Sequence, residues 1–326
     1  MDITVVYNRV ADLPFGNPQD LLADNDTVIM AGKVAKALET LDHKISLLEL
    51  DEETITTLPK VQTDCFFNLC GGINSLPHTE SQAAKALEDT GKPVAGSSAT
   101  AIALTTDKAA TKKLLLANNL PTPKYWVAAK MPADLTGFSY PVIVKPVAED
   151  CSLGISADSV FVNPDGLVKK ITELHRLYDE PVLVEEYIDG RELRVSIVGN
   201  GPDRIVLPIS ELVFGQTFAH KFKIFDFSAK WLPGSTPYED TEAVSPADLP
   251  DSVRTLVEQV SLAAFSLTGC ADYGRVDIRL DKKGTPYILE INANPAIGPD
   301  DALATSAAAA GLSYPQLLER IVQAAL

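Results

Sequence analysis

Residues 273–295 read YGRVDIRLDKKGTPYILEINANP, two runs of alternating apolar and polar residues on either side of a Lys-Lys-Gly turn. Strict alternation of this kind predicts a half-buried antiparallel hairpin. Because side chains alternate along a strand with a period of two, one face of the hairpin is apolar and belongs in a core. That face comprises Val276, Ile278, Leu280, Leu289 and Ile291.

The other face of the hairpin is polar. With Lys283-Gly284 at the centre of the turn, this face carries two facing pairs, Asp277 with Glu290 and Arg275 with Asn292, and just beyond them Asn294. Cross-strand neighbours lie roughly 5 Å apart, so two carboxylates and an amide oxygen converge. Oxygen ligands suit magnesium, which keeps waters and substrate phosphates as its remaining ligands. A solvated polar face is the simpler explanation of the hairpin taken alone, and the rest of the chain decides between the two.

Length and composition describe a globular protein of two or three domains, with 326 residues, 46% hydrophobic and 22% charged. The formal net charge of −16 argues against nucleic acid and anionic membranes as partners. There is no apolar run of roughly 18 residues and no basic leader, so we expect a cytoplasmic protein. The four cysteines show neither CxxC pairing nor zinc-ligand spacing, and we expect them to be reduced: Cys65, Cys70, Cys151 and Cys270.

The first hundred residues alternate short apolar runs with helix-like stretches at about 25–41 and 79–90. Such alternation predicts an open, largely parallel sheet covered by helices. Ligands collect at the carboxyl ends of the strands in this architecture. The loops that follow two of these strands are therefore candidate substrate contacts: Asn8, Arg9, Cys70, Gly71 and Gly72.

A helix predicted from Thr106 or Asp107 to about Asn118 is followed by Pro121 and Pro123, which suggest a hinge into a second domain. The next clear strand, 140–147, contains a single lysine, Lys145, in an apolar run. A buried lysine is costly unless an anion compensates it, although a lysine snorkelling at a strand edge stays possible.

The following loop, AEDCSLGI, contains Ser152 and can present backbone N–H groups to phosphate.

The segment VLVEEYIDGRE turns abruptly acidic at Glu185 and Glu186, and Glu192 follows the Asp189-Gly190 turn. A strand edge at such a junction can offer backbone groups to an adenine while a carboxylate binds ribose hydroxyls. A solvated acidic turn explains the same residues.

Residues 214–238 are aromatic, irregular and basic, which is typical of a lid that closes over phosphates.

Three helices are predicted in the last part of the chain. Residues 251–268 form an amphipathic helix that ends at Gly269. An alanine-rich helix lies near 301–310, and a final helix begins at about Tyr314 with Ser313 as its N-cap and Gln316 three residues later.

In chain order these features resemble the ATP-grasp superfamily and, within it, the D-alanine:D-alanine ligase-like branch. The motifs that carry the resemblance are TTDK ending at Lys108, PVIVKP, EDCSLG, VEEYIDGRE, FDFSAK ending at Lys230, GRVDIRLD and LEINANP. The resemblance implies an α/β fold with an α+β ATP-binding part, in which the nucleotide lies between two α+β domains. It divides the chain into an N-terminal α/β domain (1–104), a small central subdomain (105–188) and a C-terminal domain with the metal site (189–326).

The resemblance also implies roles for individual residues. Lys108, Lys145 and Ser152 would contact ATP phosphates, Glu185, Glu186, Tyr187 and Ile188 would line the adenine pocket, and Glu192 would bind the ribose. Lys230 would reach the γ-phosphate and Arg275 would steady the developing negative charge, so these two and Ser152 are the catalytic candidates. Asp277, Glu290 and Asn292 would bind two Mg²⁺ ions, or Mn²⁺. The substrate-side candidates are Cys151, Asn294 and Asp301.

Several substrate-side positions depart from the family pattern. Asp150 and Cys151 replace a Gly and a Ser, Cys70 replaces a His, Trp231 replaces a Tyr, and Asp301 stands where a serine receives the acceptor's carboxylate. Since an aspartate repels a carboxylate, we expect an intact ATP and metal half and a substrate half that is rewritten for a cationic or otherwise non-D-alanine partner.

The implied activity is an ADP-forming ligase that joins a carboxylate to an amine through an acyl phosphate, with amino acids or small peptides as substrates. Two alternatives stay open: an authentic D-alanine:D-alanine ligase, and a nucleotide-binding protein without turnover. A homodimer is an expectation from the family alone.

Overall fold

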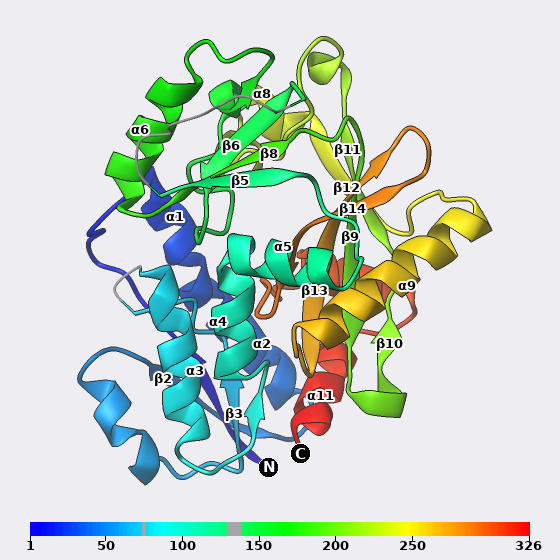
Figure 1. Ribbon diagram of the computed structural model, residues 1–326. Coiled ribbons are helices and arrows are strands. Elements are labelled where there is room, and N and C mark those ends of the chain that lie inside the picture. The colour runs from blue at the N-terminus through cyan, green and yellow to red at the C-terminus, as the bar shows by residue number, and fades with distance from the viewer. Residues whose placement is uncertain (74–75, 130–138) are drawn as a thin grey trace.

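The computed structural model describes residues 1–73, 76–129 and 139–326. Three β-sheets with helices packed on them are arranged around a central region (Figure 1). The strands run in the orders β2-β1-β3-β4, β5-β8-β6-β7 and β12-β11-β9-β13-β14, with β10 paired to β9. This arrangement matches the α/β architecture with an α+β part that the sequence predicts.

The first sheet is parallel throughout, as the alternation of strand and helix signals predicts. Its strands are β1 (Asp2–Tyr7), β2 (Lys44–Glu49), β3 (Cys65–Asn68) and β4 (Val94–Ala95). The helices of this part of the chain are α1 (Leu21–Asp24), α2 (Asp26–Glu39), α3 (Glu80–Glu88) and α4 (Ala99–Thr106). The sequence analysis did not predict α4, whose N-cap is Ser98, because its alanine-rich sequence has no amphipathic periodicity.

The second sheet is antiparallel and consists of β5 (Tyr125–Ala128), β6 (Val142–Pro146), β7 (Val160–Phe161) and β8 (Val182–Glu186). Its associated helices are α5 (Lys108–Ala117) and α6 (Leu167–Tyr178). Asp107 caps α5 by accepting a hydrogen bond from the backbone N–H of Ala110, so Lys108 stands at the first helical position, as predicted.

The third sheet contains the hairpin of residues 273–295 as β13 (Tyr273–Asp281) and β14 (Pro286–Asn292). The other strands are β9 (Gly190–Val198), β10 (Ile205–Val206), β11 (Ser210–Phe214) and β12 (Thr241–Val244). The helices that follow or interrupt them are α7 (Phe227–Trp231), α8 (Thr236–Glu239), α9 (Asp251–Leu267), α10 (Ala302–Ala309) and α11 (Tyr314–Ala325). Two short helices, α7 and α8, thus occupy the segment that the sequence analysis treated as irregular.

The pairing of the hairpin confirms the predicted register, with Asp277 opposite Glu290 and Arg275 opposite Asn292. The assignment of Leu289 to the core face was wrong. The register shifts between Asp277 and Ile278, so that Ile278 pairs with Ile288, and Ile288 is fully buried in its place. An irregularity of this kind redirects the side chains that follow it, and Leu289 lines a cavity.

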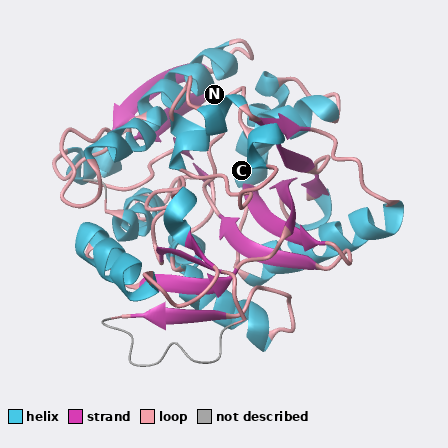
Figure 2. Cartoon of the chain, turned by 90° about the horizontal axis from the view of Figure 1, so that it is seen from above, coloured by secondary structure: helices cyan, strands magenta, loops and turns pink. Residues whose placement is uncertain are grey.

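The core under the first sheet is built from both ends of the chain. One hydrophobic cluster joins Val5, Val34 and Leu38 to Leu317 and Leu318 of α11. The N- and C-terminal ends accordingly lie close together in both views (Figures 1 and 2). Two further clusters lie beneath the third sheet and between α6 and the second sheet. The domain boundaries at 104 and 188 remain predictions.

In the described part of the chain, none of the helices combines the length and the apolar character needed to cross a membrane. The four cysteines are free, as predicted, and Cys65, Cys70 and Cys270 are buried.

Candidate active site

Two adjoining cavities lie where the three sheets meet. The smaller has a volume of about 160 Å³ and the larger a volume of about 550 Å³. Nine residues line both, so the cavities form one continuous site with a shared junction. These are Glu149, Asp150, Cys151, Arg194, Phe225, Lys230, Asn294, Pro295 and Ala296.

The smaller cavity brings together nearly every residue that the resemblance singled out. They come from four separate parts of the chain: α5, the second sheet with its loop 149–155, residues 214–238 (called the lid segment after the sequence prediction), and the third sheet. They are Lys108, Lys145, Cys151, Ser152, Glu185, Glu186, Tyr187, Ile188, Glu192, Lys230, Arg275, Asp277, Glu290, Asn292 and Asn294. Asp301 lines the larger cavity instead.

Lys108 is almost fully buried, with 3% of its surface exposed. Its Nζ donates to the backbone oxygen of Glu149 at 2.6 Å and lies 3.0 Å from the carboxylate of Asp150 and 3.9 Å from that of Glu290. Burial lowers the pKa of Lys108, but Asp150 and Glu290 outweigh it and the pKa is raised. Lys108, at the start of α5, therefore carries a positive charge at the cavity wall.

Lys145 lies in β6 and is 5% exposed, so the prediction of a buried, compensated lysine is confirmed and the strand-edge alternative is wrong. The compensating anion is Glu185, whose carboxylate lies 2.6 Å from Lys145 and 2.7 Å from a second buried lysine, Lys112 of α5. Burial opposes the ionisation of Glu185, yet the two lysines outweigh it and lower the pKa of Glu185. Burial lowers the pKa of Lys112 to about 8 against the effect of Glu185. Glu185 is thus a counter-ion inside the protein and not part of a solvated turn.

The polar face of the third sheet carries a row of ion pairs. Arg275 donates two hydrogen bonds to the two carboxylate oxygens of Asp277, at 2.6 and 2.8 Å. On the same face Arg279 lies 2.9 Å from the carboxylate of Glu192. Burial lowers the pKa of Arg275, but Asp277 outweighs it and the pKa is raised. The solvated-face explanation of the hairpin is therefore wrong, because Asp277 is only 7% exposed.

A divalent cation fits the donor set formed by Asp277, Glu290 and Asn292. Burial would raise the pKa of Glu290, but Lys108, Lys145 and Arg275 lower it to about 2, so this carboxylate is ionised at neutral pH. Within the described residues no group of three or more Asp, Glu, His or Cys side chains is arranged as a metal site. Two carboxylates and an amide oxygen are nevertheless the sparse set that Mg²⁺ uses when phosphates supply its other ligands.

The loop 149–155 and the lid segment hold each other in place at the junction of the cavities. Cys151 and Ser152 adopt left-handed backbone conformations, with φ of 56° and 63°. The Ser152 hydroxyl donates to the backbone oxygen of Phe225 at 2.7 Å, and Trp231 Nε1 donates to the backbone oxygen of Cys151 at 2.9 Å. This loop therefore presents Cys151 and Ser152 to the site from a strained but tethered turn.

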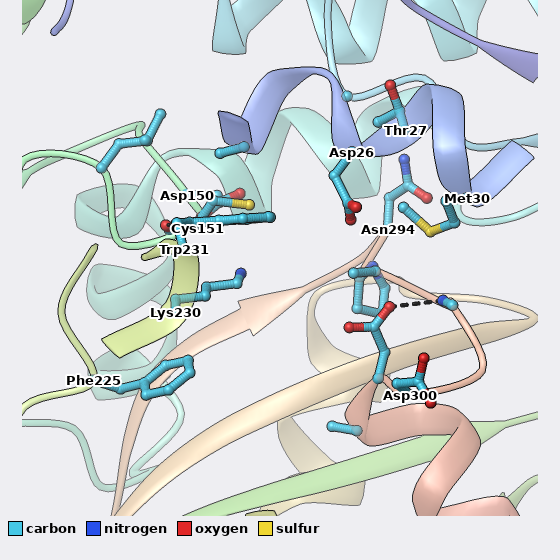
Figure 3. A pocket seen from close by; sticks show the side chains of 18 of the residues that line it. Asp26, Thr27, Met30, Asp150, Cys151, Phe225, Lys230, Trp231, Asn294 and Asp300 are labelled. Atoms are coloured by element: carbon cyan, nitrogen blue, oxygen red, sulfur yellow. Dashed lines mark hydrogen bonds between the residues drawn. The ribbon is translucent and has the colours of Figure 1, made fainter. Parts of the chain in front are cut away.

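Lys230 of α7 points into the cavity from the lid side (Figure 3). It has no ion pair within the described residues, and its Nζ lies 5.0 Å from the ring centroid of Trp231. Burial raises the pKa of the neighbouring Cys151 thiol, which argues against its acting as a thiolate nucleophile.

The larger cavity has acidic side chains opposite Lys230. Asp26 at the start of α2 faces the cavity in Figure 3, and Asp300 and Asp301 line it from the loop before α10. Burial raises the pKa of Asp26, and the charge of Asp301 raises it further. Asp301 Oδ2 accepts a hydrogen bond from the backbone N–H of Gly298 at 2.7 Å.

The candidate substrate loops after β1 and β3 are partly confirmed as cavity walls. Asn8 and Gly71 line the larger cavity. Arg9 does not line either cavity, and its guanidinium lies 3.1 Å from Glu49 at the surface. Asn294 ties the third sheet to the first, since its side chain hydrogen-bonds with Tyr273, Glu80 and the backbone oxygen of Cys70.

Sequence reasoning missed several charged residues of the site. Arg279 follows Arg275 and Asp277 by the same two-residue step, so the alternation of β13 could have revealed it. Arg194 lies at the same spacing from Glu192 on β9. Asp26, Lys112 and Glu80 carry no signal in sequence, because only the packing of α2, α5 and α3 brings them to the site.

Comparison with known proteins identifies relatives of this chain. The family model described as the D-ala D-ala ligase C-terminus matches residues 122–323. An uncharacterized protein, y4sG, from Sinorhizobium fredii is 33% identical over 91% of this chain and 87% of its own length. A D-alanine–D-alanine ligase from Bordetella petrii is 30% identical over 93% of this chain and 89% of its own length.

Solved structures show the same fold. The D-alanine–D-alanine ligase from Bacillus anthracis complexed with ATP superposes with a TM-score of 0.77, at 23% identity, over 100% of this chain and 97% of that one. The VanG D-Ala:D-Ser ligase from Enterococcus faecalis also gives a TM-score of 0.77, at 20% identity, over 100% of this chain and 99% of that one.

The fold and the site together define an ATP-dependent, amide-forming ligase of the ATP-grasp class. Within that class the chain belongs to the D-alanine–D-alanine ligase family, because the family model covers more than half of it and the similarity to the relatives extends over nearly its whole length.

Proposed function

We propose that this protein joins the carboxylate of one amino acid or small peptide to the amine of another, releasing ADP and phosphate. The observation that carries the proposal is the convergence of Lys108, Lys145, Lys230 and Arg275 on one cavity that opens into a second, larger cavity. Phosphoryl transfer needs positioning and charge neutralisation more than covalent help from the protein. Four cations in a protein of net charge −16 supply that locally.

The smaller cavity would hold ATP. Lys108, Lys145, Lys230 and Ser152 would contact the phosphates, and Arg275 would neutralise charge that develops during transfer. The end of β8 and the turn beyond it, Glu185 to Ile188, would line the adenine, and Glu192 would bind the ribose. Mg²⁺ held by Asp277, Glu290 and Asn292 would neutralise phosphate oxygens.

In the reaction, a carboxylate oxygen of the acid attacks the γ-phosphorus and the bond to the β,γ-bridging oxygen breaks. ADP leaves with that electron pair, and an acyl phosphate remains. The amine then attacks the acyl carbon, phosphate leaves, and the nitrogen loses a proton to give the amide. The protein holds the acid at the junction of the cavities and the amine in the larger one, near Cys151, Asn294 and Asp301.

The acceptor is proposed to differ from D-alanine. Asp301 and Asp26 place two acidic groups along the larger cavity. Burial raises the pKa of Asp26 and the charge of Asp301 adds to the effect, while Lys230 and Lys33 oppose it. Another carboxylate brought to the same place would be repelled, whereas an ammonium group would be attracted. A cationic amine is therefore the favoured acceptor class.

Of the two other functions, one has specific support and the other does not. The relatives named D-alanine–D-alanine ligase favour an authentic enzyme of that specificity. A nucleotide-binding protein without turnover would keep the fold, but it would not need the buried, mutually compensated charges around Glu185 and Glu290. A homodimer stays a prediction from the family.

A phosphate-release screen over pairs of amino acids, with ATP and Mg²⁺, tests the proposal. We expect release that requires both an acid and an amine, with the largest rates for basic acceptors. Lys108→Met should reduce the rate by about 100-fold, since it removes a charge from the phosphate site. Lys113→Met, on the exposed side of the same helix, is the matched control and should leave the rate unchanged.

The outcomes separate the three functions. Formation of D-alanyl-D-alanine as the preferred product would refute the altered acceptor specificity. Nucleotide binding without release for any pair would favour the non-catalytic alternative.

A further inference from the structure

Arg194 is a charged residue at the junction of the two cavities, and the reaction described above gives it no role. It lies in β9, opposite Asp277 of β13 and Ser210 of β11, on the polar face of the third sheet. Its side chain lines both cavities, unlike Lys108, Lys145 and Arg275, which line only the smaller one. Arg194 therefore stands where the nucleotide part of the site meets the substrate part.

Within the described residues, the guanidinium of Arg194 forms no ion pair with a carboxylate. No hydrogen bond or ion pair of this side chain exists among the described residues, and its Nε atom is buried without a partner. The carboxylate of its cross-strand partner, Asp277, already accepts from Arg275 with both oxygens. The described contact of the Arg194 guanidinium is with the ring of Phe225, whose centroid lies 4.7 Å from Cζ.

This lack of compensation contrasts with the neighbouring cations. Lys108, Lys145, Arg275 and Arg279 each have a carboxylate within 4 Å. Burial and the like charge of Arg275 lower the pKa of Arg194, and the charges of Asp277, Glu192 and Glu290 oppose this effect. A partly buried arginine with unused donors is costly, and a bound anion removes the cost.

Two anions could pair with Arg194, the triphosphate of ATP and the carboxylate of the acid substrate, and the position of Arg194 favours the carboxylate. A triphosphate in the smaller cavity already meets the other cations, and the basic residues of the larger cavity are Lys33, Arg194 and Lys230. Lys33 lies 3.8 Å from Asp300, so Arg194 and Lys230 are the two that remain without an ion pair there in the described chain. A guanidinium also presents paired N–H groups that match a carboxylate.

We propose that Arg194 is the receptor for the carboxylate of the acid substrate and holds it at the junction for attack on the γ-phosphorus. The inference rests on the proposed ligase function and deepens it. While the carboxylate oxygen bonds to phosphorus and ADP departs, Arg194 stays paired with the acyl oxygen that does not react. No proton moves in this step. The substrate must therefore bind with an ionised carboxylate that is not blocked as an amide.

Thermal unfolding with Mg²⁺ and β,γ-imido-ATP tests this assignment without turnover. The probes are the free D- and L-amino acids, each compared with its carboxamide. We expect some free amino acids, and not their amides, to raise the Tm of the wild type. Arg194→Gln should abolish that rise, and Arg194→Lys should restore part of it because it keeps the charge without the paired donors.

Two controls separate binding from folding. Arg191→Gln removes an arginine from the same strand that lines neither cavity and pairs with Glu211, so it should keep the amino-acid effect. Without any amino acid, Arg194→Gln should be at least as stable as the wild type, because it removes an uncompensated charge. In the phosphate-release assay Arg194→Gln should raise the KM for the acid by about tenfold or more and leave the KM for ATP unchanged.

Each contrary result has a distinct meaning. If Arg194→Gln keeps the full amino-acid effect, Arg194 is not the receptor and the ligase function stands. If the KM for ATP rises and the KM for the acid does not, Arg194 serves the triphosphate and the inference is overturned. If no free amino acid stabilises the wild type, the receptor assignment is overturned, and the phosphate-release screen tests the proposed function separately.

Discussion

At the scale of single residues, the site is organised by buried charges that compensate one another. Glu185 shows this most clearly, since it is 1% exposed and lies within hydrogen-bonding distance of both Lys112 and Lys145. Replacing a whole buried ionic group by apolar residues can be neutral, but removing one partner leaves the others uncompensated. The loss of Glu185 would leave two buried ammonium groups without a counter-ion.

We predict that Glu185→Gln lowers the free energy of unfolding by about 3–5 kcal/mol. Urea denaturation followed by circular dichroism measures this change. Glu186→Gln is the matched control, because Glu186 is a more exposed neighbour that lies 3.7 Å from the exposed Lys124, and it should change stability by less than about 1 kcal/mol. Equal effects of the two substitutions would contradict the structural role of Glu185.

Glu80 gives the protein a predictable pH dependence. Burial raises the pKa of this carboxyl to about 8, and the charge of Asp150 adds to the effect while the hydrogen bond from Asn294 opposes it. A raised carboxyl pKa means that the folded state binds its proton more tightly than the unfolded state does. The resulting contribution to stability is fully present below the unfolded pKa, near 4.5, and is lost as the pH rises towards 8.

Glu80→Gln should therefore flatten the pH dependence of stability. Relative to the wild type, the variant should gain stability steadily from about pH 5 to about pH 8, since Gln keeps a neutral side chain at every pH. Urea midpoints measured at one-unit intervals check this. A difference between the two proteins that does not vary with pH would refute the raised pKa.

At the scale of elements, local signals determine where helices begin. The capping box predicted for the last helix is present: Ser313 Oγ accepts from the backbone N–H of Gln316, and Gln316 Oε1 accepts from the backbone N–H of Ser313 at 2.8 Å. Both groups lie within four residues of each other, so the sequence alone specifies the contact. The helix that results, α11, supplies part of the core of the first sheet.

Ser313→Ala should lower the free energy of unfolding by about 1 kcal/mol, because it leaves a backbone N–H of the first turn without its acceptor. Ser313→Asp keeps an acceptor at the same position and should restore most of the loss. Urea denaturation of the two variants provides the comparison. If Ser313→Asp is as unstable as Ser313→Ala, the cap does not account for the effect.

At the scale of the whole molecule, the two ends of the chain share one core. Leu318 of α11 is fully buried against residues of α2 and the first sheet. A substitution near residue 318 therefore acts on a sheet that is made from the first hundred residues. The same packing places α2, and with it Asp26, against the loop that carries Asp301.

Leu318→Ala should lower the free energy of unfolding by about 2–5 kcal/mol through the cavity that it creates. Leu116→Ala, at a leucine that is 51% exposed, is the matched control and should change it by less than about 0.5 kcal/mol. Because the core is shared, far-ultraviolet circular dichroism and tryptophan fluorescence should report a single transition at the same urea concentration. Separate transitions for the two probes would show that the ends of the chain unfold independently.

The sequence by itself determined the elements and faces whose signals are local. The alternation in residues 273–295 predicted the hairpin and its facing pairs, and Asp107 and Ser313 marked the starts of two helices. The order of motifs along the chain also identified the class of ligase. The hairpin and the two helix starts depend on neighbours within a few residues or on a fixed two-residue period, so no distant contact is needed to predict them.

Only the tertiary structure decided which charges meet. The pairing of Glu185 with Lys112 and the approach of Asp26 to Asp301 depend on elements far apart in the chain. The same holds for Arg194, whose Nε is buried without a partner among the described residues. The shift of Leu289 out of the core likewise follows from an irregular pairing within the sheet. Electrostatic interactions act through space and depend on burial, and neither distance nor burial is encoded at a single position of the sequence.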